Sequence, residues 1–288
     1  MKENELQEFN KTAEKRVVES TEDIDKKDVD NIQACSEYAK DISSYLRLRE
    51  TTMKYTEQYI KEQTEILPEH REKIIEWFIK VQMKHPLKDE TIYLAVNILD
   101  RFLEKKKISR GKLPLLAVAA ILIAGKYEEI YPPHLTSYIA LGDKKFTVQE
   151  CLQMEVLVLI TLNYDLSAPS VLTFLLRYVK YVDFDKTKLK LAMYICEVQL
   201  LTTIMGKYEP SLLALSGLYL TAKTSNKDFT PSESLLKEAK HTEEEVKQCA
   251  RDMLENMLVK DRIMLSKIRE KYLKYKDVVK IELNTINI

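Results

Sequence analysis

Hydrophobic and polar residues alternate along most of this chain with a period near 3.6, which is typical of amphipathic helices. The clearest stripe lies in residues 89–105, where apolar positions from Ile92 to Leu103 recur at i, i+3, i+4 and i+7. Asp89 is a candidate N-cap for this helix. Comparable stripes predict further helices over 35–49, 69–84, 134–141 and 147–162. Thr147 and Glu150 form a candidate capping box at the start of the last one.

A different pattern occupies residues 112–126, where no charged or strongly polar side chain lies between Leu113 and Gly125. A helix that is apolar on every face must be surrounded by protein or by lipid. This run is shorter than the ~20 residues that a membrane span needs. We therefore expect the central helix of a helical bundle. It ends in a charged cluster, KYEE, followed by paired prolines.

The same succession of patterns then returns in the second half of the chain. A mostly apolar segment, SLLALSGLYLTAK at 211–223, aligns with LLAVAAILIAGK at 115–126. Around it, helices are predicted over 169–178, 186–204, from Ser232, and over 243–258, with a basic amphipathic helix over 262–276. Strand signals are almost absent. The sequence predicts an all-α fold of two tandem five-helix units with flanking N- and C-terminal helices.

These patterns divide the chain into five parts. We expect a flexible N-terminal tail (1–33), an N-terminal helix and linker (34–67), a first helical unit (68–165), a second helical unit (166–261), and a C-terminal helix and tail (262–288). The stretch from 50 to 67 is predicted to be irregular.

Composition narrows the function classes. Lys plus Arg and Asp plus Glu both number 45, so overall charge gives no reason to expect binding to nucleic acid or to a membrane surface. The N-terminus has no apolar region of a secretory signal. The cysteines, which have no metal-ligand spacing, are expected to be reduced and mostly buried: Cys35, Cys151, Cys196 and Cys249.

Two charges stand where the pattern predicts apolar surroundings. Glu155 is the only charge in helix 151–162, while Lys126 closes the central helix. The spacing predicts that Glu155 shares a face with Val148, Cys151, Leu152, Leu159 and Leu162. A charge partly removed from water needs a partner. The two residues could form an internal ion pair or lie on a solvated rim, which the pattern alone favours. Alternatively, both could project from the bundle edge and bond the backbone of another protein.

Nothing in the sequence indicates catalysis. It has no Walker A loop, dinucleotide-binding glycine motif, nucleophile elbow or HExxH pair, so we expect no enzyme activity, cofactor or metal site. The single tryptophan, Trp77, lies at helical spacing beside Ile74 and Phe78. Core packing is its expected role, and a docking groove is the alternative.

Several separate motifs resemble the cyclin family, in particular the mitotic A/B type. They are REKIIEWFIKV at 71–81, LAVNILDRFL at 94–103, KYEEIYPP at 126–133 and FTVQECLQMEVLVLITLNYDLSAP at 146–169. The resemblance covers about 38–275, strongly in the first unit and weakly in the second. It implies two cyclin boxes and a non-enzymatic subunit that binds and activates a cyclin-dependent kinase during cell division, at G2/M, in the nucleus or cytoplasm.

The resemblance also implies which residues contact the kinase. Lys126 and Glu155 match the family's lysine and glutamate that bond the kinase backbone beside its αC helix, which favours the second interpretation of that pair. Further expected kinase contacts are Tyr127, Glu128, Glu129, Ile130, Tyr38 and Ile42.

A second family site, the groove for Arg-x-Leu substrate motifs, is matched only in part. Ile74, Trp77 and Arg110 are in place. The family has apolar residues at the positions of His70 and Lys73, an acid at that of Lys80, and Gln at that of Pro114. We therefore expect weak or altered docking of kinase substrates.

The N-terminal tail carries a short candidate degradation signal. Lys2, Glu3 and Asn4 spell a KEN motif, which would bring ubiquitin ligase machinery as a partner.

Two other roles remain open. A cyclin-fold transcription factor would bridge DNA and polymerase, but the zero net charge and the Lys126/Glu155 pair count against it. A helical adaptor without a kinase partner is the second alternative.

Overall fold

The computed structural model describes residues 24–142, 146–225, 228–260, 266–273 and 275, and all its regular elements are helices. The α-helices are α2 (Ala39–Thr52), α3 (Tyr59–Glu62), α4 (Pro68–Lys84), α5 (Asp89–Lys105), α6 (Leu113–Glu128), α7 (Leu135–Leu141), α8 (Val148–Thr161), α9 (Val171–Tyr178), α10 (Lys186–Val198), α11 (Ile204–Lys207), α12 (Pro210–Ser225), α13 (Glu233–Ala239), α14 (Glu243–Lys260) and α15 (Ser266–Tyr272). Short 3-10 turns are η1 (Ile24–Asp28), η2 (Ile32–Ala34), η3 (Ser36–Tyr38), η4 (Arg110–Lys112), η5 (Val179–Tyr181) and η6 (Gln199–Leu201). The all-α prediction is confirmed.

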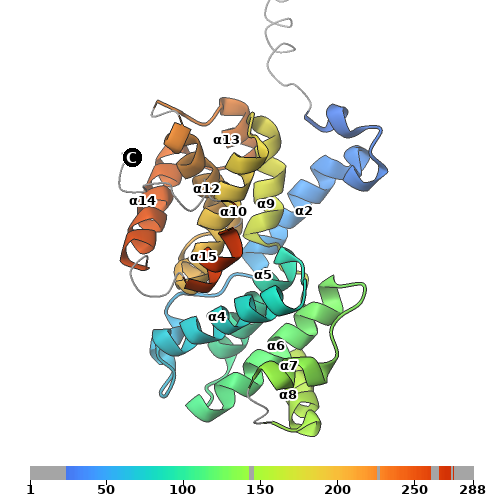
Figure 1. The fold of residues 1–288 in the computed structure, drawn as a ribbon. Coiled ribbons are helices and arrows are strands. Elements are labelled where there is room, and N and C mark those ends of the chain that lie inside the picture. The colour runs from blue at the N-terminus through green and yellow to red at the C-terminus, as the bar shows by residue number, and fades with distance from the viewer. Residues whose placement is uncertain (1–23, 143–145, 226–227, 261–265, 274, 276–288) are drawn as a thin grey trace, which may run out of the picture.

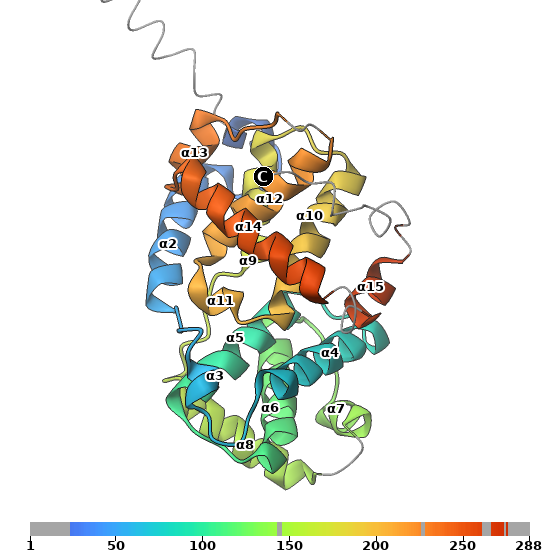
Figure 2. The ribbon, with the colours of Figure 1, turned by 90° about the vertical axis from the view of Figure 1, so that its left-hand side faces the viewer.

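The helices form two bundles stacked end to end (Figure 1). The first contains α4 to α8, and the second contains α9 to α14. Helix α2 runs along the second bundle, beside α9 and α12, and α15 packs against both α4 and α10 (Figure 2). The chain before the first bundle and the helix after the second therefore both contact the second bundle.

Each bundle is built around one buried apolar helix, α6 in the first and α12 in the second. Helix α6 packs against α5 and α8, and α12 packs against α9, α10 and α14. Small residues permit this close packing: Ala119, Ala120 and Ala124 have no exposed surface. At Gly217, the counterpart of Ala120, even a Cβ would lie 2.4 Å from the Cys196 sulfur, so only glycine fits there without a shift.

Several predicted boundaries were wrong in detail. Helix α2 begins at Ala39 rather than Cys35, and the stretch predicted to be irregular contains α3. The predicted helix over 186–204 ends at Val198 and is followed by η6 and α11. The C-terminal helix ends at Tyr272 rather than at 276, and its predicted start at 262 lies outside the described residues. The Thr147–Glu150 capping box is present as predicted. Of the predicted tail, 1–33, residues 1–23 lie outside the described residues, whereas 24–33 contain η1 and the start of η2, and Asp25 of η1 accepts a hydrogen bond from Arg177.

A buried ion pair contacts the backbone of the segment that follows Val198. Arg71 of α4 donates to both carboxylate oxygens of Asp100 on α5, at 2.8 and 2.7 Å. Its remaining guanidinium nitrogen donates to the carbonyl oxygens of Leu200 and Thr202, at 2.9 and 3.0 Å. Those carbonyls point to the first bundle instead of continuing a helix. Arg71 and Asp100 are 1% and 0% exposed, so this contact joins the bundles out of water.

Helix α15 makes a second polar contact with both bundles. The Lys271 ammonium donates to Glu197 of α10 at 2.7 Å and to Asp89 of α5 at 2.7 Å. Asp89 is the first residue of α5, and Lys88 occupies the N-cap position without a capping side chain. The prediction that Asp89 caps this helix was therefore wrong. The Lys271 ammonium lowers the pKa of Asp89, against the opposing effect of burial.

Two arginines attach α2 to the rest of the chain. Arg49 donates to Asp165 and to Ser167 in the connection between the bundles. Arg47 donates to Glu50 at 2.6 Å and to Ser211 at the start of α12, beside His241. Helix α2 is therefore positioned by polar contacts that continue into the second bundle.

Among the helices formed by described residues, none combines the length and the apolar content of a transmembrane segment.

Replacing Asp100 by Ala should strongly destabilise the fold, because it leaves the Arg71 guanidinium buried without its counter-charge. We expect the free energy of unfolding to fall by about 3–5 kcal/mol, measured by urea denaturation. Glu244→Ala, which removes an exposed partner of Arg251, is the control and should cost less than about 1 kcal/mol. A similarly small loss for Asp100→Ala would contradict the role given to the buried pair.

The α2 attachment should weaken in acid. Burial and the nearby Arg47 lower the pKa of His241, whereas Glu209 and Glu245 act in the opposite direction. The unfolded chain therefore binds a proton at His241 more readily than the folded chain does. The stability that neutral His241 contributes is present above the ordinary pKa of histidine and is lost as the pH falls through that pKa. We expect urea denaturation between about pH 7.5 and about pH 5.5 to show a smaller loss for His241→Gln than for the parent chain. The exposed His134→Gln should keep the full pH dependence, and an unchanged dependence in His241→Gln would contradict the assignment.

Candidate functional site

The two charges singled out in the sequence meet at the edge of the first bundle. Lys126, in the last turn of α6, donates from Nζ to Oε1 of Glu155 on α8 at 2.6 Å. The side chain of Lys126 is 50% exposed and that of Glu155 is 10% exposed. Packing of α8 on α6 brings them together, and the capping box fixes the start of α8. The structure thus contains the internal ion pair that the pattern alone favoured.

The pair still has unused hydrogen-bonding capacity. An ammonium has three N–H donors, and a carboxylate accepts at two oxygens, so one mutual bond leaves both groups able to bond further. Because Lys126 is half exposed, a second polypeptide can reach its remaining donors. Such a pair can bond a carbonyl and an N–H of the same backbone segment.

Exposed apolar side chains surround this polar pair. Tyr127, Ile130 and Tyr131 follow Lys126 and are all exposed, Ile130 to 81%. Helix α8 adds an outward stripe at every fourth position, formed by Val148, Leu152, Val156 and Ile160. Large apolar side chains gathered beside a partly exposed ion pair are typical of a protein–protein interface.

The face predicted for Glu155 combines residues from the inner and the outer side of α8. Cys151 and Leu162 are buried near it, but Val148 and Leu152 lie on the outer face of α8. The helix is apolar on two faces, so its periodicity could not show which face meets the core.

Helix α2 presents a second exposed apolar stripe. Tyr38 and Ile42, two of the expected kinase contacts, are exposed, and Tyr45 and Leu48 continue the same stripe. This helix lies along the second bundle, whereas Lys126 and Glu155 belong to the first (Figure 1). The sequence reasoning did not include Tyr45 and Leu48 among the expected contacts.

The paired acids after Lys126 have different surroundings. Glu129 is tied back to the start of α5, where it accepts from the backbone N–H of Lys88 at 2.7 Å and from the Thr91 hydroxyl. It therefore anchors the loop that follows Lys126. Burial and the nearby Glu90 raise the pKa of Glu128, whereas Lys88 acts in the opposite direction.

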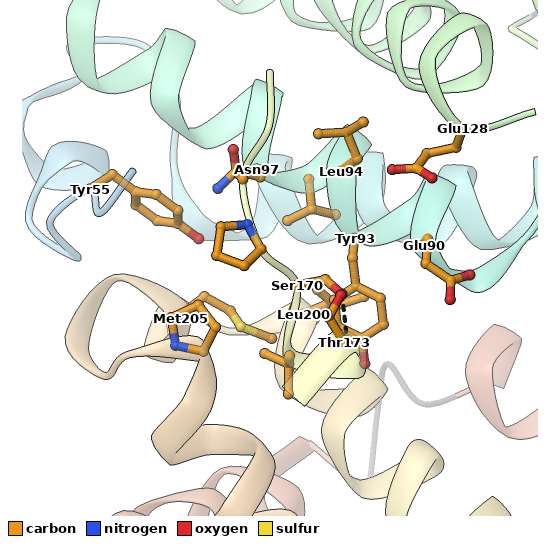
Figure 3. Close-up of a pocket in the computed structure, with 15 residues that line it drawn as sticks. Tyr55, Glu90, Tyr93, Leu94, Asn97, Glu128, Ser170, Thr173, Leu200 and Met205 are labelled. Atoms are coloured by element: carbon orange, nitrogen blue, oxygen red, sulfur yellow. Dashed lines mark hydrogen bonds between the residues drawn. The ribbon is translucent and has the colours of Figure 1, made fainter. Parts of the chain in front are cut away.

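Figure 3 shows Glu128 and Glu90 at one side of a small cavity between the bundles. Tyr55, Leu94 and Met205 contribute to its walls, and its volume is about 80 Å³. Ligand pockets for small molecules are usually several times larger, roughly 300–1,000 Å³. The cavity is therefore too small to hold a substrate of ordinary size.

The residues of the expected docking groove lie on and near α4. Trp77 is partly buried and donates from its indole nitrogen to the Leu141 carbonyl at 2.9 Å, while Ile74 is buried and Arg110 is exposed. Lys73 and Lys80 are exposed. His70 accepts a hydrogen bond from the backbone N–H of Leu67 at 3.1 Å and so caps α4, a role that an apolar residue could not fill.

No arrangement for chemistry emerges from the described part of the chain. It contains no group of three His, Cys, Asp or Glu side chains placed to hold a metal ion. The cysteines are unpaired, and Cys151, Cys196 and Cys249 are buried while Cys35 is exposed. Burial raises the pKa of each buried thiol, which disfavours the reactive thiolate. Lys2, Glu3 and Asn4 lie outside the described residues.

Comparison with known families assigns both helical units. The model of the cyclin N-terminal domain matches residues 41–167, and the model of the cyclin C-terminal domain matches residues 169–283. Together these matches include both bundles and α2.

Curated relatives and a solved structure agree with this assignment. The chain is 41% identical over 201 residues to a G2/mitotic-specific cyclin-B of Arbacia punctulata, covering 69% of this chain and 49% of the relative. It is 36% identical over 255 residues to a G2/mitotic-specific cyclin-A of Patella vulgata, covering 87% and 60%. The chain thus spans about half to three fifths of these relatives' length.

The fold is similar to that of a viral cyclin from herpesvirus saimiri, with a TM-score of 0.66 at 22% identity, covering 75% of this chain and 96% of the other. Two matching domain models and relatives among the A- and B-type mitotic cyclins show that this chain belongs to the cyclin family.

Proposed function

We propose that this chain is a regulatory subunit that binds and activates a cyclin-dependent kinase and controls progression through G2/M. The observation that carries the proposal is the Lys126–Glu155 pair, half exposed among outward apolar residues at the end of the buried helix α6. Cyclin relatives named for G2 and mitosis support the stage of the cell cycle. A fold similarity to a chain of a yeast kinase complex, with a TM-score of 0.58 at 11% identity, agrees with the architecture.

The physical mechanism would be a population shift in the kinase. Lys126 and Glu155 would bond the backbone next to the kinase αC helix, while the α8 stripe and Ile130 would bury apolar surface against that helix. A partner that binds the active arrangement more tightly than the inactive one raises the population of the active arrangement. The cyclin would need no catalytic group of its own.

The exposed stripe of α2 would extend the same interface. Tyr38 and Ile42 would contact the kinase, and the Arg47 and Arg49 contacts would hold α2 in position before binding. A pre-positioned helix loses less conformational entropy when it binds.

The two alternative roles have less support. A transcription factor that holds DNA needs a basic surface, and the chain has no net charge. A helical adaptor without a kinase partner could use the same kind of exposed surface, but the relatives named G2/mitotic-specific cyclins favour a kinase regulator. We propose the nucleus or cytoplasm as the location, and ubiquitin ligase machinery as a further partner through Lys2, Glu3 and Asn4.

Removing both charges of the pair should weaken kinase binding without unfolding the chain. For Lys126→Ala combined with Glu155→Ala, we expect a loss of about 2 kcal/mol or more, roughly thirtyfold in Kd, by calorimetry with a purified cyclin-dependent kinase. The matched control is Lys207→Ala with Asp252→Ala, because this pair also joins a half-exposed lysine to a more buried acid, in the second bundle. Equal affinity in the test variant and its parent would refute the site.

Substrate docking should be altered by the charges on α4. Lys73 and Lys80 would repel the arginine of an Arg-x-Leu peptide, so we expect weak binding to the parent chain by fluorescence anisotropy. Lys80→Glu should strengthen binding several-fold, whereas the exposed Lys61→Glu, on α3, should not. Tight binding to the parent chain that is lost in Trp77→Ala would show instead that ordinary docking is retained.

A further inference from the structure

A cavity lies where α15 meets both bundles, away from the Lys126–Glu155 pair. It has a volume of about 440 Å³ and is open to solvent. Its walls come from the end of α4 and the following turn, from α10, and from α15. Figures 1 and 2 show α15 resting on these elements.

The walls of this cavity combine apolar and aromatic residues with polar and charged ones. The apolar and aromatic part is formed by Met83, Pro86, Leu87, Tyr272 and Tyr275. Of these, Met83 and Pro86 are exposed. The volume lies within the range of ligand-binding pockets, roughly 300–1,000 Å³.

Most charges around the cavity already have opposite charges beside them. Lys271 is shared between Asp89 and Glu197, at 2.7 Å to each, and Gln82 donates to the same Asp89 oxygen at 2.8 Å. Glu270 pairs with Lys267 at 2.8 Å. These contacts hold α15 in place, and the charged groups that make them are not available to pair with a ligand.

Lys190 of α10 is the exception. Its ammonium lies 3.4 Å from the Met193 sulfur and 5.8 Å from the centre of the Tyr275 ring. No carboxylate among the described residues lies within ion-pair distance of it, and the nearby Asp89 is already bonded by Lys271 and Gln82. A thioether and an aromatic face stabilise the charge of an ammonium less than a carboxylate does.

We propose that this cavity binds a short acidic peptide segment of a partner protein, with one carboxylate on Lys190 and an adjacent apolar side chain against Met83 and Pro86. Charge complementarity argues for the acid, because the Lys190 ammonium makes no ion-pair contact with a carboxylate of the described residues, and the nearby Asp89 is already bonded by Lys271 and Gln82. The apolar and aromatic walls argue for the neighbouring hydrophobic residue. Such a segment would touch both bundles and α15 at once. The proposal is independent of kinase binding.

The test uses the full chain with its methionine methyl groups labelled for NMR. The probe is a capped peptide with the sequence Ala-Leu-Glu-Phe-Ala, titrated to about 5 mM. We expect saturable shifts of the Met83 and Met193 signals, which lie in the cavity wall and beside Lys190. The matched peptide with Gln in place of Glu should bind about fivefold or more weakly, because it lacks the charge.

Variants of the chain separate a charge effect from a general one. Lys190→Gln should weaken binding of the acidic peptide about fivefold or more, whereas Lys190→Arg should retain it. Lys186→Gln removes an exposed charge at the start of the same helix and should leave binding unchanged. The proposal is overturned if the acidic peptide gives no saturable shift, if the Gln peptide binds equally well, or if Lys190→Gln has no effect.

Discussion

The arrangement of the two cyclin boxes depends on a guanidinium that has been taken out of water. Arg71 meets Asp100 within the first bundle and uses its remaining donors on two carbonyl oxygens of the second. Burying such a charge costs free energy unless each of its donors has a hydrogen-bond partner. Here Asp100 of the first bundle and two backbone carbonyls of the second supply those partners. The contact therefore sets how the second bundle sits on the first. It also bonds the carbonyls of Leu200 and Thr202, in the segment that follows α10, across the interface.

The bundle edge follows a different rule, since its charges remain partly in water. Lys126 and Glu155 pair with each other, yet the ammonium is half exposed and apolar side chains surround it. Because this surface is exposed, its hydrogen-bonding groups can still bind a partner, which those of a core contact cannot do. Glu129 supports the site by bonding the loop that follows Lys126 to the start of α5. The site is thus prepared by the fold before a partner arrives.

Sequence patterns were sufficient to predict the helical units and their two central helices, because helix α6 and helix α12 are apolar on every face. They also identified Lys126 and Glu155 as charges out of place. They could not predict the contact between Arg71 and the backbone after Val198, because the two segments lie more than a hundred residues apart in the sequence. Nor could they orient α8, whose inner and outer faces are both apolar. The pairing of Lys271 with Asp89 depends on the long-range docking of α15, which local capping rules do not include.

The central claim is that the edge of the first box acts on a kinase. The most direct measurement is the rate of substrate phosphorylation by a purified, monomeric cyclin-dependent kinase with and without the full chain. We expect the chain to stimulate the kinase in a saturable manner, and to do so only weakly when Lys126 and Glu155 are both replaced by Ala. The absence of stimulation of every cyclin-dependent kinase tested, or full stimulation by the doubly substituted chain, would contradict the claim.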